Sequence, residues 1–200
     1  MTKPQKRSLD EQQDLDSRLA DAAKRGDTGM AQTLLAKGAN VHSDTDVALC
    51  FACEHGHTET VTMLLAAGAD IHAREDDALR WAACCGHTET VKALLANGAD
   101  VHADHDYALR RAVFYGHTET VQVLAAHIFA PDSWRVKSRV EIEDQAKALY
   151  SKIEADNPRP ERLRKAATIF ANSAIDCWHQ VRPAPPKLKI SPLPARPRPV

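Results

Sequence analysis

Apolar side chains recur along the chain at helical spacing, and glycine closes each group. Val61, Leu64 and their neighbours follow the i, i+3, i+4 pattern of one buried helix face, and Gly68 follows where that helix should end. A shorter apolar group begins at Leu49 and stops at Gly56. Each such stretch therefore predicts two short amphipathic helices joined by a tight turn.

The whole pattern returns every 30 residues. The sequence Gly-His-Thr-Glu-Thr occupies residues 56–60, 86–90 and 116–120, with the apolar positions in register around it. A more divergent copy lies upstream, between Asp16 and Gly38, and its charged residues suit a terminal unit that is exposed to water. The repeat predicts about four helix-turn-helix units, which is enough for a stable stack.

Polar positions of the repeat have predicted structural roles. Asp46, Asp76 and Asp106 stand where the first helix of each unit needs an N-cap. Six of the ten histidines also recur with the repeat, and we expect them to hydrogen-bond loop backbone: His42, His72, His102, His57, His87 and His117. The scaffold thus accounts for most of the histidines without any catalytic role.

The run Gly-His-Thr-Glu-Thr-Val-x-x-Leu-Leu-x-x-Gly-Ala-Asp-Val/Ile-His-Ala resembles the second half of an ankyrin repeat. The resemblance implies an all-α ankyrin-repeat solenoid, here with short repeats similar to those of bacteria and large viruses. Two departures stand out: the ankyrin period is usually longer than the 30 residues seen here, and Val-Ala-Leu-Cys at 47–50 replaces the usual Thr-Pro-Leu-His box. Because the missing residues fall in the loop, we expect short or absent β-hairpin fingers.

Composition and spacing divide the chain into four predicted regions. These are a disordered N-terminus at 1–13, the ankyrin array at 14–130, a C-terminal helical cap at 131–182 and a Pro-rich basic tail at 183–200. The cap is predicted to contain helices at 132–156 and 161–181 that cover the end of the stack. Their predicted apolar face consists of Trp134, Val140, Leu149, Ile153, Leu163, Ala166, Phe170, Ala174 and Trp178.

Two features of the C-terminal regions stay open at this point. The Leu-x-x-Ala-Ala sequence at 163–167 also fits a degenerate fifth repeat. The tail reads either as a solubilising extension or, through Pro-x-x-Pro at 194–197, as a ligand for an aromatic-lined groove.

Charge and cysteine content bear on the binding partners and the cellular compartment of the protein. The 26 basic and 27 acidic residues give a net charge of −1, so nothing draws the chain as a whole to nucleic acid or to acidic membranes. No apolar run is long enough to span a bilayer. Five cysteines, an odd number, and a polar N-terminus without a signal peptide favour a reducing compartment. We expect a cytoplasmic protein, or one delivered to a host cytosol.

A zinc site is the only metal chemistry that the sequence suggests. Cys50-x-x-Cys53-x-His55-x-His57 contains suitable ligands, but Cys53 aligns with Ala83 in the next unit, which indicates a small buried side chain instead. Adjacent Cys84 and Cys85 are interpreted as ordinary thiols. No nucleophile-base pattern, P-loop or dinucleotide motif is present, so we expect no catalysis, no metal, no cofactor and no small-molecule substrate.

Positions that differ between otherwise identical units are candidates for recognition. The resemblance places partner contacts of ankyrin proteins on the loop tips and on the inner face of the first helices. Carried onto this chain, the candidate partner-binding residues are Glu54, His55, Arg74, Glu75, Asp77, Arg80, Trp81, Cys84, Cys85, His105, Tyr107, Arg110, Arg111, Phe114 and Tyr115. Alternatively, Phe51 and Trp81 pack between neighbouring first helices, and Phe114 and Tyr115 contact the C-terminal helices.

The sequence therefore predicts a protein-protein interaction module, acting as an adaptor, inhibitor or effector. The alternative is binding of nucleic acid or an anionic surface through Arg80, Arg110, Arg111 and the basic tail. Acidic residues lie near these arginines and no aromatic-basic stacking motif is evident, which favours a protein partner.

Overall fold

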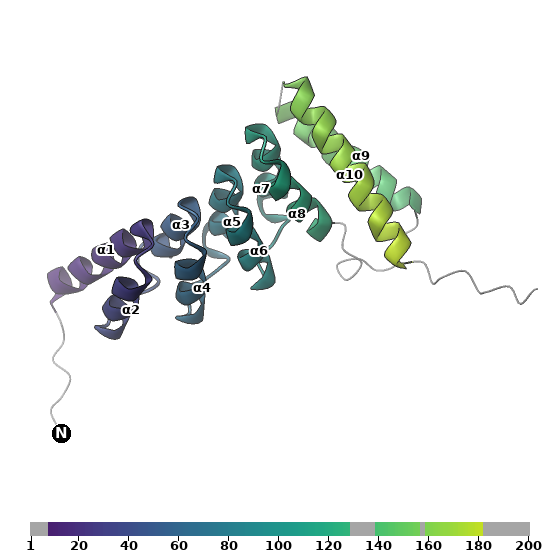
Figure 1. Cartoon of the computed structure of the whole chain (residues 1–200). Coiled ribbons are helices and arrows are strands. Elements are labelled where there is room, and N and C mark those ends of the chain that lie inside the picture. The colour runs from purple at the N-terminus through teal and green to yellow at the C-terminus, as the bar shows by residue number, and fades with distance from the viewer. Residues whose placement is uncertain (1–7, 129–138, 157–158, 182–200) are drawn as a thin grey trace, which may run out of the picture.

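The computed structural model describes residues 8–128, 139–156 and 159–181, and this part of the chain folds into ten helices without a strand. The first eight helices form four antiparallel pairs stacked in a row (Figure 1). The first helices of the pairs, here called the inner helices, are α1 (Leu9–Arg25), α3 (Val47–Glu54), α5 (Ala73–Cys85) and α7 (Ala103–Tyr115). The second, outer helices are α2 (Thr28–Ala36), α4 (Thr58–Ala66), α6 (Thr88–Ala96) and α8 (Thr118–Ile128). The predicted all-α solenoid is confirmed.

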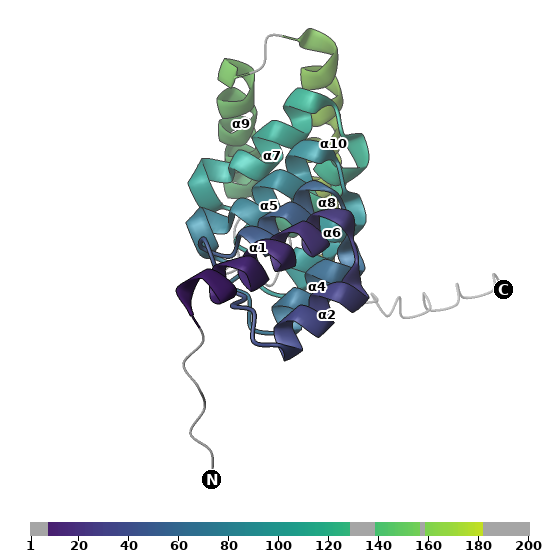
Figure 2. The same cartoon turned by 90° about the vertical axis from the view of Figure 1, so that its left-hand side faces the viewer.

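Within each row, every helix packs against the equivalent helix of the next unit. Inner helices contact the next inner helix and outer helices the next outer helix, so that Figure 2 shows two parallel rows seen along the stack. Leucines at one position of each inner helix are fully buried, and Ala52 and its equivalents beside them are fully inaccessible. The methyl side chain of alanine lets neighbouring helices approach closely while leaving no void. None of the helices in the described ranges is both long and apolar enough to cross a membrane.

A histidine ring joins each unit to the preceding one. The Nε2 atom of His87 hydrogen-bonds the carbonyl oxygen of Glu54 at 2.9 Å, and His117 bonds Cys84 in the same way at 2.9 Å. The ring lies across the glycine that ends the preceding inner helix, so this glycine has room only for a hydrogen atom. The expected bonding of these histidines to backbone is confirmed.

Threonine hydroxyls form a second link between units. Thr58 and Thr90 hydrogen-bond each other at 2.8 Å, and Thr88 bonds Thr120 at 2.9 Å. Thr90 and Thr120 are almost fully buried, so these hydroxyls need the partner that the preceding unit supplies.

The predicted N-cap position of Asp46 is confirmed, but its side chain makes no capping bond, because its φ of 61° turns the carboxylate toward the following loop. Asp76 and Asp106 likewise end a left-handed turn before the regular part of α5 and of α7. An oxygen of Asp46 instead accepts the backbone N–H of Asp70 at 2.9 Å, and Asp76 accepts that of Asp100 at 2.8 Å. These carboxylates fasten the loop that leads to the next unit.

The expectation that His42, His72 and His102 bond loop backbone through their rings is wrong, because Nδ1 of each ring pairs with one of these aspartates instead. The Nδ1 atom of His72 lies 3.1 Å from a carboxylate oxygen of Asp76, and that of His102 lies 2.8 Å from Asp106. The hydrogen bond to the aspartate raises the pKa of both His72 and His102 above the ordinary value of 6.5. Burial of Asp106 opposes its ionisation, but hydrogen bonds from His102 and from Lys152 outweigh it and lower the pKa of Asp106.

Because the pKa values of His72 and His102 are raised, the free energy of unfolding is expected to decrease as the pH rises from about 6 to about 8. A raised folded-state pKa contributes stability that is fully present below the unfolded pKa and is lost as the pH rises through the folded pKa. Urea unfolding at both pH values measures this decrease. It should be smaller for a His72→Gln, His102→Gln variant than for the natural chain. Equal pH dependence of the two proteins would contradict the assignment.

A left-handed turn takes the place of a β-hairpin between the units. Three consecutive residues with positive φ precede the regular part of each inner helix after the first. These are residues 44–46 before α3, 74–76 in α5 and 104–106 in α7. Left-handed backbone costs about 1–2 kcal/mol for a residue with a Cβ. The loop is therefore compact but strained.

Replacing Thr45 by glycine should stabilise the protein by about 0.5–1 kcal/mol, since glycine tolerates positive φ but loses more entropy on folding. Thr45 is exposed, is β-branched and has a φ of 58°. The matched control is Thr62→Gly on the exposed surface of α4, which should cost about 1 kcal/mol. Chemical denaturation measures both; a less stable Thr45→Gly protein would disprove strain at this turn.

The N-terminal end differs from expectation. Helix α1 begins at Leu9, inside the segment for which disorder was predicted, while residues 1–7 lie outside the described part. Ser8 and Glu11 form a capping box: the Ser8 side chain accepts from the N–H of Glu11, and Glu11 accepts from the N–H of Ser8. This reciprocal cap extends the helix beyond the repeat.

Two further helices close the C-terminal end of the stack. Helix α9 (Arg139–Asp156) contacts α7, and α10 (Pro160–Val181) contacts α8 and α9. The predicted buried positions Leu149, Ile153 and Phe170 are confirmed, as are Leu163 and Ala166. Of the other predicted apolar residues, Trp134 and the side chains of Val140, Ala174 and Trp178 lie outside the described part, as does the proline-rich tail.

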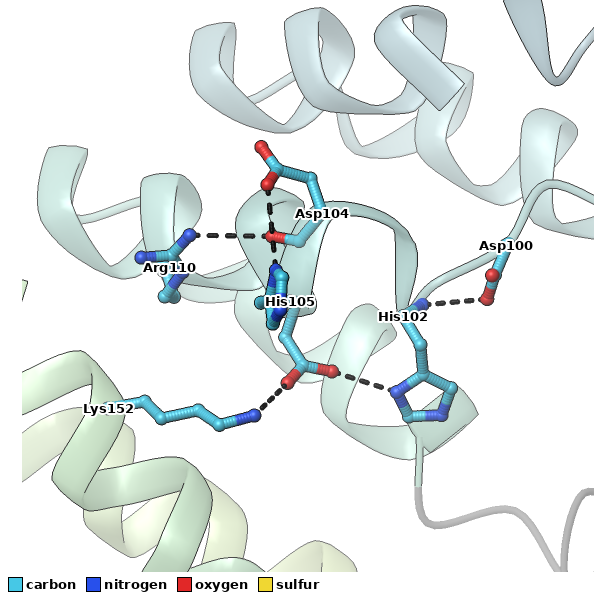
Figure 3. Close-up of polar contacts among 7 residues, drawn as sticks. Asp100, His102, Asp104, His105, Arg110 and Lys152 are labelled. Atoms are coloured by element: carbon cyan, nitrogen blue, oxygen red, sulfur yellow. Dashed lines mark hydrogen bonds and ion pairs between the residues drawn. The ribbon is translucent and has the colours of Figure 1, made fainter. Parts of the chain in front are cut away.

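Lysine and arginine from these helices replace the bonds of a missing fifth unit. Lys152 of α9 reaches a carboxylate oxygen of Asp106 at 3.2 Å, on the carboxylate that also meets His102, and Figure 3 shows both basic side chains. Arg162 of α10 donates to the carbonyl oxygen of Phe114, the position equivalent to the carbonyls that accept from the repeat histidines. The two helices thus satisfy polar groups that the last unit would otherwise expose.

Candidate partner-binding face

The inner helices present one side to the core and the opposite side to solvent. In α5 the residues Ala78, Leu79, Ala82 and Ala83 are buried. Their helical spacing leaves a second stripe outside the core, and the same holds in α7. We call this stripe the inner-helix face; it consists of Asp77, Arg80, Trp81 and Cys84 on α5 and Tyr107, Arg110, Arg111 and Phe114 on α7.

Three arginines gather around one tyrosine on this face. The guanidinium carbon of Arg80 lies 4.4 Å from the centre of the Tyr107 ring, that of Arg111 4.7 Å and that of Arg110 5.3 Å. Arg111 also lies over Phe114, at 5.8 Å. Distances below ~6 Å are those of cation-π attraction. We call Arg80, Tyr107, Arg110 and Arg111 the arginine cluster.

The cluster corrects the sequence interpretation that aromatic-basic stacking is not evident. Arg80 belongs to the unit before Tyr107, so their contact depends on how two inner helices stack. Tyr107 and Arg111, however, are spaced i, i+4 on one helix, and that spacing was a usable signal.

Acidic residues compensate the charge of Arg80 only in part. Arg80 nitrogens lie 3.8 Å from Asp77 and 3.9 Å from Asp104, distances beyond those of hydrogen bonds. The buried Nε atom of Arg80 has no hydrogen-bond partner within the described residues. A hydrogen bond with Tyr107 raises the pKa of Arg111 further above that of free arginine, so its charge is permanent.

Aromatic side chains are exposed beside the cluster. Trp81 is 40% exposed and Tyr115 46%. Both are too accessible to be ordinary core residues, so the alternative of Trp81 packed between inner helices does not describe it. Phe114 is half-buried and meets Tyr115 edge-on, with ring centres 5.1 Å apart.

Tyr115 also contributes to a groove between the last unit and α10. The groove is lined by Tyr115, Val121, Ile169 and, among others, the charged residues Arg162 and Lys165. Of the two residues for which contact with the C-terminal helices was the alternative, Phe114 meets α10 through its carbonyl group, which accepts from Arg162, and Tyr115 faces α10 across this groove.

The remaining candidate residues lie at the edges of the inner-helix face. Arg74 donates to the carbonyl oxygen of Asp44, and Glu75 and His105 are exposed in the left-handed turns. Glu54 is half-buried at the end of α3, and exposed His55 bonds the carbonyl oxygen of Phe51 at 3.0 Å. These residues do not join the arginine cluster.

Cys50, Cys53, Cys84 and Cys85 are free thiols. Burial, with the charge of Asp77 as the next cause, raises the pKa of Cys50 to about 11. Burial also raises the pKa of Cys53 and, to a smaller degree, that of exposed Cys85. Thiols with raised pKa are poor nucleophiles and poor metal ligands at neutral pH. No group of three His, Cys, Asp or Glu side chains within the described ranges could hold a metal ion.

Sequence reasoning missed three basic residues with defined contacts. Lys152 and Arg162 come from helices that have no copy in the repeat, so they could not be aligned with equivalent residues of other units. Lys24 lies 5.6 Å from the ring of Phe51, on the inner helices of the first two units.

Comparison with known proteins bears on the repeats alone. A family model of ankyrin repeats, with three copies, matches residues 8–75 and again residues 72–133. No curated protein matches the chain. The matched region includes all four helix pairs described above, with their 30-residue period and their links between units. The chain belongs to the ankyrin-repeat family.

Proposed function

We propose that this protein binds a partner protein through the inner-helix face of α5 and α7, as a non-enzymatic adaptor, inhibitor or effector in a cytosol. Ankyrin repeats generally serve as protein-protein interaction modules. The observation that carries the proposal is that residues of the inner-helix face vary more between units than residues that build the stack. Most residues that build the stack are the same from unit to unit, whereas most positions of the face differ, as Trp81 and Arg111 do; Arg80 and Arg110 are the exception.

The chemistry of the face agrees with this proposal. Tryptophan, tyrosine and arginine are the residue types that contribute most to protein interfaces. Trp81 and the arginine cluster supply all three on the inner-helix face of two neighbouring helices, and exposed Tyr115 follows Phe114 at its edge. Their rigid aromatic rings offer contact area at a low entropic cost.

Affinity capture from the native source tests the proposal. A Trp81→Ala, Tyr115→Ala variant removes the two exposed rings while leaving the buried leucines intact, and circular dichroism checks its fold. The matched control is Met30→Ala, since Met30 is equally exposed at 40% but lies on outer helix α2. We expect a partner to co-purify with the natural chain and the control and to be lost from the double variant. Capture of the same proteins by all three would refute binding at this face.

A further inference from the structure

The arginine cluster concentrates positive charge on the inner-helix face. Three guanidinium groups lie within 5.3 Å of the centre of one ring, so the charges of Arg80, Arg110 and Arg111 repel one another at short range. Asp77 and Asp104 oppose the charge of Arg80 through long contacts of 3.8 and 3.9 Å. An added negative charge would relieve this repulsion.

Arg111 has the geometry of a carboxylate receptor. Its guanidinium lies over the faces of Tyr107 and Phe114, and no carboxylate of the described residues pairs with it. Stacking uses the face of the guanidinium plane, so the N–H groups at its edge that do not meet Tyr107 are available for a bidentate contact.

Arg80 adds a second incompletely satisfied cation beside the same ring. Its terminal nitrogens are too far from Asp77 and Asp104 for hydrogen bonds. Burying part of a charged group without full hydrogen bonding is costly, so an incoming acceptor gains from this site. The fold holds these donors in place before any partner arrives.

We propose that the arginine cluster binds an acidic segment of the partner protein, with an Asp or Glu carboxylate seated on Arg111 and Arg80 and an apolar neighbour against Trp81. This inference rests on the proposed function and specifies the partner's chemistry.

The charge arrangement favours an acidic peptide over nucleic acid. A nucleic-acid strand needs a continuous basic track along its phosphates. Here the arginines surround one ring, and Asp77 and Asp104 border them beside Arg80. A single carboxylate fits between these acidic groups, whereas a row of phosphates would meet them.

Selection from a random peptide library displayed on phage tests the inference with the full-length chain as bait. We expect peptides enriched by the natural chain to contain an excess of Asp and Glu. This excess should disappear with Arg111→Gln and persist with Lys92→Gln, which removes an exposed charge from outer helix α6. Circular dichroism of both variants excludes misfolding, and Arg80→Gln provides a second variant of the cluster.

Direct binding then measures the size of the effect. Changing the acidic residues of the best peptide to their amides should weaken binding about tenfold or more, because a hydrogen bond to a charged group contributes roughly 1.5–3 kcal/mol. The natural chain should also bind this peptide more tightly than it binds a thymidine oligonucleotide of the same net charge.

Several results would overturn the inference. The inference is contradicted if no peptide is enriched, or if the enriched peptides show no excess of Asp and Glu. It is also contradicted if this excess survives Arg111→Gln or if the oligonucleotide binds more tightly than the peptide. Such results leave the proposed function to be decided by the capture experiment, which removes Trp81 and Tyr115 and leaves the arginines in place.

Discussion

Replacing Gly56 by alanine is expected to destabilise the protein by about 2–4 kcal/mol, from left-handed strain and a lost hydrogen bond. Gly56 has a φ of +72°, and a Cβ there would lie 2.5 Å from Nδ1 of the His87 ring. The ring would have to move and give up its bond to the carbonyl oxygen of Glu54. Urea unfolding followed by circular dichroism measures the loss.

Gly68 provides the matched control in the same unit. Its φ is +96°, but a Cβ there would meet no atom within 4 Å. Gly68→Ala therefore carries the backbone strain alone, about 1–2 kcal/mol. The difference between the two variants isolates the histidine link between units. Equal losses for Gly56→Ala and Gly68→Ala would show that the histidine contact contributes nothing.

The second large effect is expected for Asp76→Ala, a loss of about 3 kcal/mol. The Asp76 carboxylate is 4% exposed and accepts bonds from the N–H of Asp100 and from His72. Removing it leaves the Asp100 N–H without its acceptor. It also places alanine in left-handed backbone, which aspartate and asparagine tolerate better.

Two variants separate these causes. Asp76→Asn keeps an acceptor oxygen and tolerates the left-handed turn, so it should lose less than half as much. Asp77→Ala changes the next residue, a half-buried carboxylate whose nearest cation is 3.8 Å away, and should cost ~1 kcal/mol or less. A loss at position 77 as large as that at position 76 would contradict the assigned role of Asp76.

The stack itself was predictable because the same physical pattern is repeated. Leu49 and its equivalents are buried as their helical spacing predicts, and Gly56 ends its helix with positive φ. Each copy of the repeat is an independent observation of one structure. Agreement among copies removes the ambiguity that a single short apolar group would leave.

The links between units were less predictable, because they depend on loop geometry. Asp46 was read as an N-cap from its place before a helix. The shortened loop puts it in a left-handed conformation instead, and its carboxylate binds Asp70. No local pattern distinguishes these two roles for an aspartate at the start of a helix.

The inner-helix face was predicted as a set of positions but not as an arrangement. Variation between units pointed to Arg80, Tyr107 and Arg111, while their assembly around one ring depends on the stacking of α5 on α7. Lys152 and Arg162 lie in helices that occur once, so their contacts with the last unit have no counterpart in the repeat.

Site-specific photocrosslinking to the captured partner tests most directly that this face is the binding surface. Benzoylphenylalanine is placed at Trp81 on the inner-helix face or, in a second sample, at Thr62 on the exposed side of outer helix α4. Our account predicts crosslinks to the partner from position 81 and none from position 62. Crosslinks from position 62 but not from position 81 would place the partner on the outer helices and contradict it.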